Sequence, residues 1–143
     1  MTQSESKLLF VYGTLLSRAT DDMGRPMRAR LARESRLVGP ATIAGRLLDF
    51  GAYPGLVVGG GSHGRVHGEV VELRDPAMSL VWLDEYEGIG AAQPYANEYE
   101  RAMQGVDLGG ERHDAWVYLR RKVPATGVAV IASGRWLGHS AAT

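Results

Sequence analysis

The segment LLFVYGTL, residues 8–15, decides how the chain is interpreted. Leu8 to Tyr12 is a short apolar run rich in β-formers and predicts a buried strand. Gly13 ends that strand and permits a close backbone approach to a ligand. Free N–H groups in the following turn, through Thr14 and Leu15, can hold a carboxylate without a basic side chain. The segment therefore predicts a strand that leads into an anion-binding turn, although it also fits an ordinary strand-ending glycine with a turn threonine.

The rest of the chain combines short strand-like segments with two helical ones. One helix is expected to begin near Pro26, with its arginines facing water. A second is expected over Pro76 to Glu87, between an N-cap at Asp75 and a C-terminal glycine, Gly88. The strand-like segments are Ala41 to Leu48, Leu56 to Val58, Val66 to Glu72, Glu98 to Val106 and Asp114 to Arg120, with a weaker one near Leu37 and a final run, Gly127 to Ala132, that fits a strand or a short helix. Short turns join them, so we expect an α+β fold with a mixed or antiparallel curled sheet, or a small β-barrel, and a few helices.

Composition limits the classes of function. With 143 residues, 45% of them hydrophobic and 22% charged, the chain fits one domain over residues 1–143, with residues 1–7 as a flexible N-terminus. The 16 Lys and Arg residues balance 16 Asp and Glu, so we expect neither nucleic acid nor a membrane as a partner. The absence of Cys excludes disulfides, thiolate metal sites and a Cys nucleophile. A polar N-terminus and the lack of an apolar run of about 18 residues predict a cytoplasmic protein.

The helix expected over Pro76 to Glu87 carries an acid on its apolar side. The three-and-four spacing of one helix face includes Ala77, Leu80, Leu83 and Glu87. Loss of water and the negative potential of a helix C-terminus both raise the pKa of a carboxyl group at this place. A raised pKa suits proton transfer near neutrality. Two interpretations stay open: Glu87 is a general acid/base, or Asp84, Glu85 and Glu87 are all solvated surface acids.

Other signals are weaker. Tyr99 and Arg101 alternate onto one face of a predicted strand, which also fits an ordinary sheet-surface contact. The glycine-rich residues 59–64 precede a strand rather than a helix, so we interpret them as a hairpin tip and not as a pyrophosphate site. His63 and His67 lack a third metal ligand. We therefore expect neither a metal site nor a cofactor.

Three motifs follow one another along the chain: VYGTL (Val11 to Leu15), LDEYEG (Leu83 to Gly88) and YER (Tyr99 to Arg101). In this order they resemble the gamma-glutamylcyclotransferase-like family. The resemblance extends to Gly45-Arg46-Leu47, the Tyr53-Pro54-Gly55-Leu56 turn, Val66 to Val70 and Ala115 to Tyr118, and so spans Leu8 to Trp136. The YGTL motif is more similar to the gamma-glutamylamine and antibiotic-biosynthesis branches than to the glutathione-pathway branch, which carries YGSN.

The resemblance implies a barrel-like α+β fold with a cavity at the end of the first strand. It also implies an intramolecular reaction, in which the α-amine of a gamma-glutamyl group attacks its own γ-carbonyl to give 5-oxoproline and release an amine or amino acid. No cofactor or metal takes part. The residues that the resemblance assigns to the site are Glu87 as general acid/base, Tyr12, Gly13, Thr14, Leu15 and Tyr99 for substrate binding, and Tyr53 and Arg101 in supporting roles.

Two other functions stay compatible with this sequence. The chain could be a non-catalytic small-molecule-binding or regulatory domain of the same fold, or an enzyme that acts on a different amide. An inward carboxylate at Glu87 argues against binding alone, because a binding module gains nothing from a group that destabilises it. The expected partner is a small gamma-glutamyl molecule, and the chain is expected to be a monomer or a homodimer.

Overall fold

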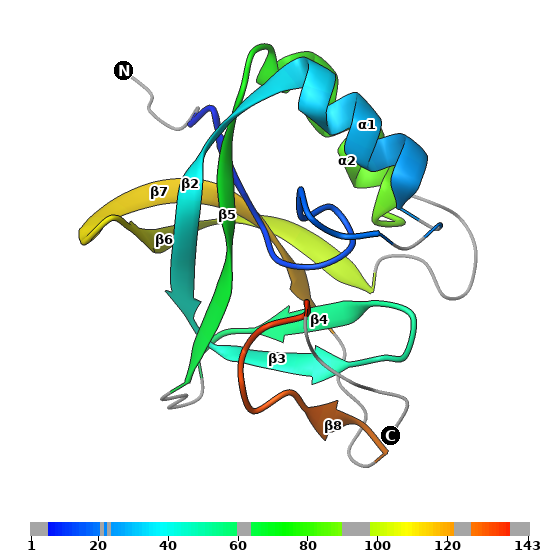
Figure 1. Cartoon of the computed structure of the whole chain (residues 1–143), viewed down its shortest axis with the longest axis vertical. Coiled ribbons are helices and arrows are strands. Elements are labelled where there is room, and N and C mark those ends of the chain that lie inside the picture. Colours follow the sequence, from blue (N-terminus) through cyan, green and yellow to red (C-terminus); the bar gives the residue numbers. More distant parts are fainter. Residues whose placement is uncertain are drawn as a thin grey trace.

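In the computed structural model, which describes residues 6–20, 22, 24–59, 64–89, 98–121 and 127–137, five strands close into a barrel (Figure 1). Around the barrel the strands follow the order β1 (Leu8–Val11), β5 (Arg65–Leu73), β2 (Ser35–Ala44), β6 (Tyr99–Leu108) and β7 (Glu111–Arg120). Neighbouring strands are antiparallel, except that β1 pairs in parallel with β7 at Leu9 and Trp116. The predicted α+β fold with a mixed barrel is therefore confirmed.

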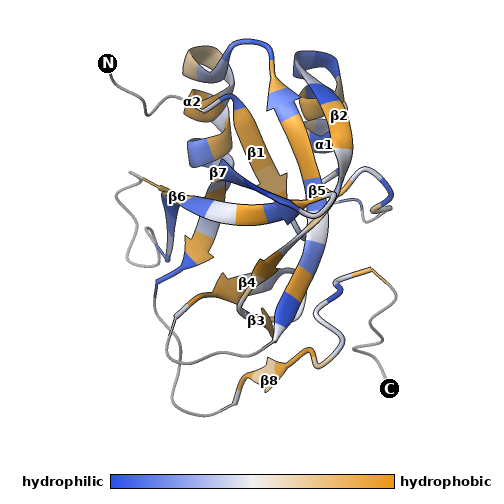
Figure 2. Ribbon diagram, turned by 90° about the vertical axis from the view of Figure 1, so that its left-hand side faces the viewer, coloured by the Kyte–Doolittle hydropathy of each residue, from blue (hydrophilic) through white to orange (hydrophobic). Residues whose placement is uncertain are grey.

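Strand β1 is covered on both faces. Leu9 and Val11 pack into a hydrophobic cluster shared with the helices, whereas Phe10 and Tyr12 pack into a second cluster with the other barrel strands. All four side chains are buried, and Figure 2 shows β1 as hydrophobic along its length. A strand with one wet face would alternate apolar and polar residues. Burial on both faces thus explains the uninterrupted apolar run at the start of the chain.

A second, smaller sheet lies below the barrel in the view of Figure 1. Its order is β4 (Pro54–Val57), β3 (Arg46–Asp49) and β8 (Ala129–Val130). The single strand predicted over Ala41 to Leu48 is wrong, because Gly45 separates β2 from β3. A Cβ at Gly45 would stand 2.7 Å from the carbonyl oxygen of Val57, so only glycine fits where the chain leaves the barrel.

Helix α1 (Arg25–Glu34) lies at the same end of the barrel as α2, the second helix (Figures 1 and 2). It begins next to Pro26 as predicted, with Leu31 as its buried residue. The expectation that its arginines face water is wrong for two of them. Arg28 donates to the carbonyl oxygen of Thr14 at 2.7 Å, and the guanidinium of Arg30 lies 4.7 Å from the ring centroid of Trp82.

Helix α2 (Pro76–Tyr86) ends one residue before the predicted boundary, with Glu87 as its C-cap. Its buried residues are Ser79, Leu80, Trp82 and Leu83. Ala77 is exposed, contrary to the predicted inward stripe. Asp75 is the N-cap residue, but its side chain makes no capping hydrogen bond. Within the ranges described above, neither helix has the length and apolar character needed to cross a bilayer.

Candidate active site

A pocket of about 270 Å³ lies where β1 ends. It is lined by Phe10, Val11, Tyr12, Gly13, Thr14, Leu15, Tyr53, Pro54, Tyr86, Glu87, Gly88, Glu98, Tyr99 and Tyr118. Every residue that the sequence assigned to the site lies in this lining, except Arg101. The lining also contains Tyr86, Glu98 and Tyr118, which the sequence did not assign to the site, although Tyr86 stands beside Glu87 in the LDEYEG motif.

The turn after β1 lines the pocket with Gly13, Thr14 and Leu15. The Leu16 N–H donates to the Gly13 carbonyl at 3.0 Å, which closes a tight turn. The amides of Gly13, Thr14 and Leu15 donate to no group among the described residues. All three residues are buried. Since buried N–H groups are nearly always hydrogen-bonded, this cluster of donors has the character of a site for an anion or a carbonyl oxygen.

Gly13 meets a constraint that the sequence did not reveal. A Cβ at this position would lie 2.6 Å from Cγ of Pro54, across the pocket wall. Pro54 in turn holds a second wall residue, because its carbonyl accepts a hydrogen bond from the Tyr99 hydroxyl at 2.8 Å. The glycine therefore allows the turn to pack against the start of β4, besides any role in approaching a ligand.

The end of α2 fixes the backbone of Glu87. The Gly88 N–H donates to the Glu85 carbonyl at 3.0 Å, and the Ile89 N–H donates to the Asp84 carbonyl at 2.9 Å. Gly88 has a φ of 78°, a left-handed conformation that glycine adopts without steric penalty. Together these features form a Schellman cap, which ends the helix at a defined point and presents the next side chain to the pocket. The predicted role of Gly88 in ending the helix agrees with this geometry.

The carboxyl group of Glu87 is poorly solvated. It accepts no hydrogen bond from the described residues. Burial, and secondarily the negative charge of Asp84, raises the pKa of Glu87 to about 7. Near neutral pH the group is therefore present in both its acid and its base form. The inward position predicted by the helix spacing is the one observed.

Asp84 and Arg101 form a bidentate ion pair behind the pocket. The Arg101 Nε and Nη2 atoms lie 2.8 and 3.1 Å from the two carboxylate oxygens of Asp84. The Tyr118 hydroxyl donates to the same carboxylate at 2.6 Å. The guanidinium also stacks over the ring of Trp116, with Cζ 4.5 Å from the centroid. Arg101 thus contacts the acid that precedes Glu87 by one helical turn and does not line the pocket.

Tyrosines form much of the remaining wall. The Tyr12 hydroxyl donates to the Tyr118 carbonyl at 2.6 Å and accepts from the Leu56 amide at 3.3 Å. Burial raises the pKa of Tyr12, Tyr99 and Tyr118 above that of free tyrosine. These hydroxyls stay protonated at neutral pH. The ring of Tyr53 packs edge-on against Tyr99, with centroids 6.4 Å apart.

An ion pair borders the pocket on the β6 and β7 side. The buried Arg120 side chain lies 3.1 Å from the carboxylate of Glu98, which lines the pocket. The Arg120 guanidinium also stacks over the rings of Phe50 and Tyr99, with Cζ 4.0 and 5.3 Å from their centroids. Tyr99 pairs with Arg120 across the two strands. The contact between Arg120 and Tyr99 depends on the register of β6 and β7, and this register cannot be derived from the local sequence.

Among the described residues, the pocket lining includes neither His67 nor any part of the glycine-rich segment noted in the sequence. Residues 60–63 of the glycine-rich segment, including His63, lie outside the described residues. His67 is half-buried on β5, and its amide donates to the Gly134 carbonyl at 2.8 Å. Throughout the described part of the chain, no group of three or more His, Cys, Asp or Glu side chains is placed to hold a metal ion.

Solved structures share this fold. YkqA from Bacillus subtilis superposes with a TM-score of 0.66 and 24% identity, over 92% of this chain and 40% of that one. This chain therefore spans well under half of YkqA. An uncharacterized protein from Pyrococcus horikoshii gives a TM-score of 0.61 and 22% identity, over 92% of this chain and 90% of that one. An AIG2-like protein from Mus musculus gives a TM-score of 0.65 and 20% identity, over 85% of this chain and 82% of that one.

Sequence comparison identifies the family. No curated protein sequence matches the chain. The family model described as gamma-glutamyl cyclotransferase, AIG2-like, matches residues 9–138, which include the turn after β1, the end of α2 and the start of β6. The chain therefore belongs to the AIG2-like gamma-glutamyl cyclotransferase family.

Proposed function

We propose that this protein is a gamma-glutamyl cyclotransferase, in which Glu87 is the general acid/base. The observation that carries the proposal is the placement of two features in one pocket. The carboxyl group of Glu87 has a pKa raised by burial to about 7, and the turn after β1 presents amide donors that have no partner among the described residues. Membership of the family supports the same reaction class.

The reaction is an intramolecular acyl transfer. A bond forms between the α-nitrogen of the gamma-glutamyl group and its γ-carbon, and the bond between the γ-carbon and the nitrogen of the leaving amine breaks. The products are 5-oxoproline and a free amine or amino acid. Nucleophile and electrophile belong to one molecule, so the protein needs to select the folded-back conformation and does not have to bring two reactants together.

Glu87 would carry the proton between the two nitrogens. As the carboxylate it takes a proton from the α-nitrogen, and as the carboxylic acid it returns that proton to the leaving nitrogen when the tetrahedral intermediate collapses. The second proton that the substrate ammonium loses balances the one that the released amine gains, by exchange with water. A carboxyl group with a pKa near 7 can perform both steps, because neither form is scarce at neutral pH.

The amides of Gly13, Thr14 and Leu15 would hold the negatively charged part of the substrate. That part is either the α-carboxylate or the oxyanion that develops on the γ-carbonyl oxygen. Preorganised N–H donors in a buried site stabilise such charge without reorganisation during the reaction. The tyrosine-rich wall would exclude water and enclose the glutamyl carbon chain.

The test is turnover of a panel of gamma-glutamyl amines and gamma-glutamyl amino acids, with 5-oxoproline measured by mass spectrometry and corrected for spontaneous cyclisation. We expect turnover of at least one substrate, and a loss of about two or more orders of magnitude in kcat for Glu87→Gln. The matched control is Glu85→Gln, which removes an exposed acid two residues away on the same helix and should retain wild-type activity.

Two outcomes would contradict the proposal. Equal rates for Glu87→Gln and Glu85→Gln would remove Glu87 from the mechanism. Binding of several panel compounds, detected by calorimetry, without any turnover by the wild-type protein would favour a non-catalytic binding domain.

A further inference from the structure

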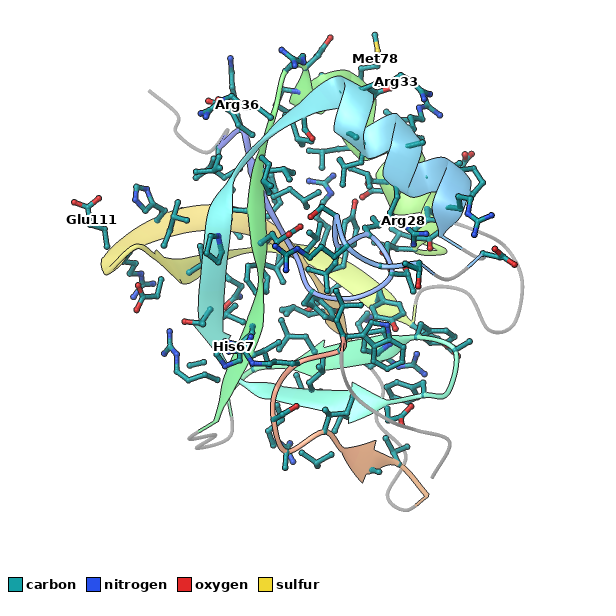
Figure 3. All side chains as sticks on the ribbon, viewed as in Figure 1. Arg28, Arg33, Arg36, His67, Met78 and Glu111 are labelled. Atoms are coloured by element: carbon teal, nitrogen blue, oxygen red, sulfur yellow. The ribbon has the colours of Figure 1, made fainter. Side chains whose placement is uncertain are left out.

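Arg28 reaches the pocket wall from outside the pocket. It lies in the N-terminal half of α1, beside the loop that follows β1 (Figure 3). Its Nη1 atom donates to the carbonyl oxygen of Thr14 at 2.7 Å. The contact needs a glycine nearby, because a Cβ at Gly24 would stand 2.8 Å from that oxygen and 3.0 Å from Arg28 Nη1. The absence of a side chain at Gly24 thus allows the Arg28 guanidinium to reach the backbone of the loop that follows β1.

The turn after β1 contributes to the walls of two cavities. Thr14 lines the pocket that holds Glu87, Arg28 lines a groove of about 420 Å³ beside α1, and Leu15 lines both. In a planar trans peptide the carbonyl of one residue and the N–H of the next point in opposite directions. Arg28, which lines the groove, holds the Thr14 carbonyl, so the Leu15 N–H of the same peptide points away from Arg28.

The described lining of the pocket contributes no basic side chain for an anionic ligand, and Arg120 at its border is paired with Glu98. Among the described residues that line the pocket, the ionisable acids are Glu87 and Glu98, and none is Lys, Arg or His. A substrate carboxylate or oxyanion beside these acids would be repelled. Arg28 places a full positive charge behind the turn, and a charged donor on the Thr14 carbonyl polarises the whole peptide and strengthens the Leu15 N–H as a donor.

We propose that Arg28 is a positioning residue for substrate binding: it orients and polarises the Thr14–Leu15 peptide so that the Leu15 N–H binds the negatively charged part of a gamma-glutamyl substrate. The inference rests on the proposed function. It assigns the compensating charge to a side chain on the far side of the pocket wall, which leaves the pocket free of a basic group that would pair with Glu87 and lower its pKa.

The experiment compares Arg28→Gln, Arg28→Lys and Arg28→Ala with the wild type. The matched control is Arg33→Gln, which removes an exposed arginine from the last turn of the same helix. The substrates are the panel compound that is turned over fastest and the corresponding 4-aminobutanoyl amide, which lacks only the α-carboxylate. Thermal unfolding of each variant reports any general loss of structure, and kcat and KM are measured separately.

We expect Arg28→Gln to lower kcat/KM for the full substrate by about tenfold or more, since a charged hydrogen bond behind a catalytic donor is lost. Arg33→Gln should stay within about twofold of wild type, as exposed substitutions do. Arg28→Lys should recover part of the loss, and millimolar guanidinium should restore activity to Arg28→Ala by entering the groove. If Arg28→Gln raises KM for the full substrate but not for the 4-aminobutanoyl amide, the backbone amides of the turn bind the α-carboxylate. If Arg28→Gln lowers kcat for both substrates, these amides bind the oxyanion.

Three results would overturn the inference. If kcat/KM of Arg28→Gln equals that of Arg33→Gln, the contact between Arg28 and Thr14 has no effect on the site, and the proposed function stays intact. A loss that follows a lowered unfolding temperature and does not respond to guanidinium would reduce Arg28 to a structural role, again with the function intact. Absence of turnover by the wild-type protein would overturn the proposed function and this inference with it.

Discussion

Asp84 and Glu87 stand three residues apart at the end of α2, and their carboxyl groups have opposite surroundings. Asp84 is held by both arms of the Arg101 guanidinium and by the Tyr118 hydroxyl. Glu87 accepts no hydrogen bond from the described residues and lines the pocket. The charge fixed on Asp84 contributes to the raised pKa of Glu87, after the larger effect of burial. One helix end thus holds one acid in an ion pair and leaves the other poised for proton transfer.

Removal of the Asp84 charge should shift the pH profile toward acid. In the wild type, kcat/KM should rise with pH through a midpoint near pH 7, where the free enzyme ionises Glu87, and level off above it. In Asp84→Asn the repulsion is gone, so the pKa of Glu87 falls and the acid limb moves to lower pH. The control is Glu100→Gln, which removes an exposed acid of β6. An acid limb that stays in place in Asp84→Asn would contradict this coupling.

Removal of the Arg101 charge should have the opposite sign. Arg101→Gln leaves the Asp84 charge uncompensated beside Glu87, which raises the pKa of Glu87 and moves the acid limb of kcat/KM to higher pH. We also expect the free energy of unfolding to fall by about 1 to 3 kcal/mol, because a partly buried hydrogen-bonded charge pair is broken. Arg112→Gln, at an exposed position of β7, is the control for charge alone. Shifts in the same direction for Arg101→Gln and Asp84→Asn would be inconsistent with this account.

Glu87→Gln should stabilise the fold at high pH. The pKa of Glu87 rises from 4.5 to about 7 on folding, so between these values the folded state binds more protons and stability decreases as pH increases. The full penalty is present above pH 7 and absent below pH 4.5. Glu87→Gln removes this penalty, so its free energy of unfolding at pH 8, measured with urea, should exceed that of the wild type by about 3 kcal/mol. At pH 4 the two proteins should be equal, and an equal difference at both pH values would refute the argument.

Glu34 should stabilise the contact between the helices in a pH-dependent way. Its carboxylate accepts hydrogen bonds from Ser79 at 2.6 Å and Trp82 at 2.9 Å. These bonds, and secondarily Arg30, lower the pKa of Glu34 to about 2. The resulting stability is complete above pH 4.5 and is lost as the pH falls toward 2.

Substitution of Glu34 tests this contact by urea unfolding. Glu34→Gln should lower the free energy of unfolding by about 1 to 2 kcal/mol at pH 7, with a smaller difference at pH 2.5. Glu72→Gln is the matched control, since Glu72 pairs with Arg36 on the surface and should change stability by less than about 0.5 kcal/mol. A pH-independent effect of Glu34→Gln would show that its charge is unimportant.

The parts of the fold that sequence reasoning predicted are those decided by local pattern. The buried strand β1, the stop of α2 at Gly88 and the inward position of Glu87 each follow from spacing within about a dozen residues. Predictions from local pattern were wrong where contacts with distant segments determine the structure. The break at Gly45 comes from contact with Val57, and α2 buries Ser79, Leu80, Trp82 and Leu83 while Ala77 stays exposed.

Most of the site residues could be named from the family motifs, and their roles stay predictions. Their supporting contacts could not be foreseen. Arg28 has the pattern of a surface arginine, and its contact with Thr14 depends on how α1 crosses the loop after β1. The pairing of Arg101 with Asp84 joins β6 to α2. Local propensities for helix and strand do not determine which residues of two different elements come into contact.

The parallel pairing of β1 with β7 affects the order in which the protein can mature during synthesis. β1 is synthesised before both strands that satisfy its edges, β5 and β7, and β7 follows it in the sequence only after both helices and five other strands. Until then an apolar strand with an unpaired edge is available to chaperones or to neighbouring nascent chains. Such distant pairing favours slow acquisition of the native state. The turn that follows β1 therefore gains its final shape only after β7 has been made.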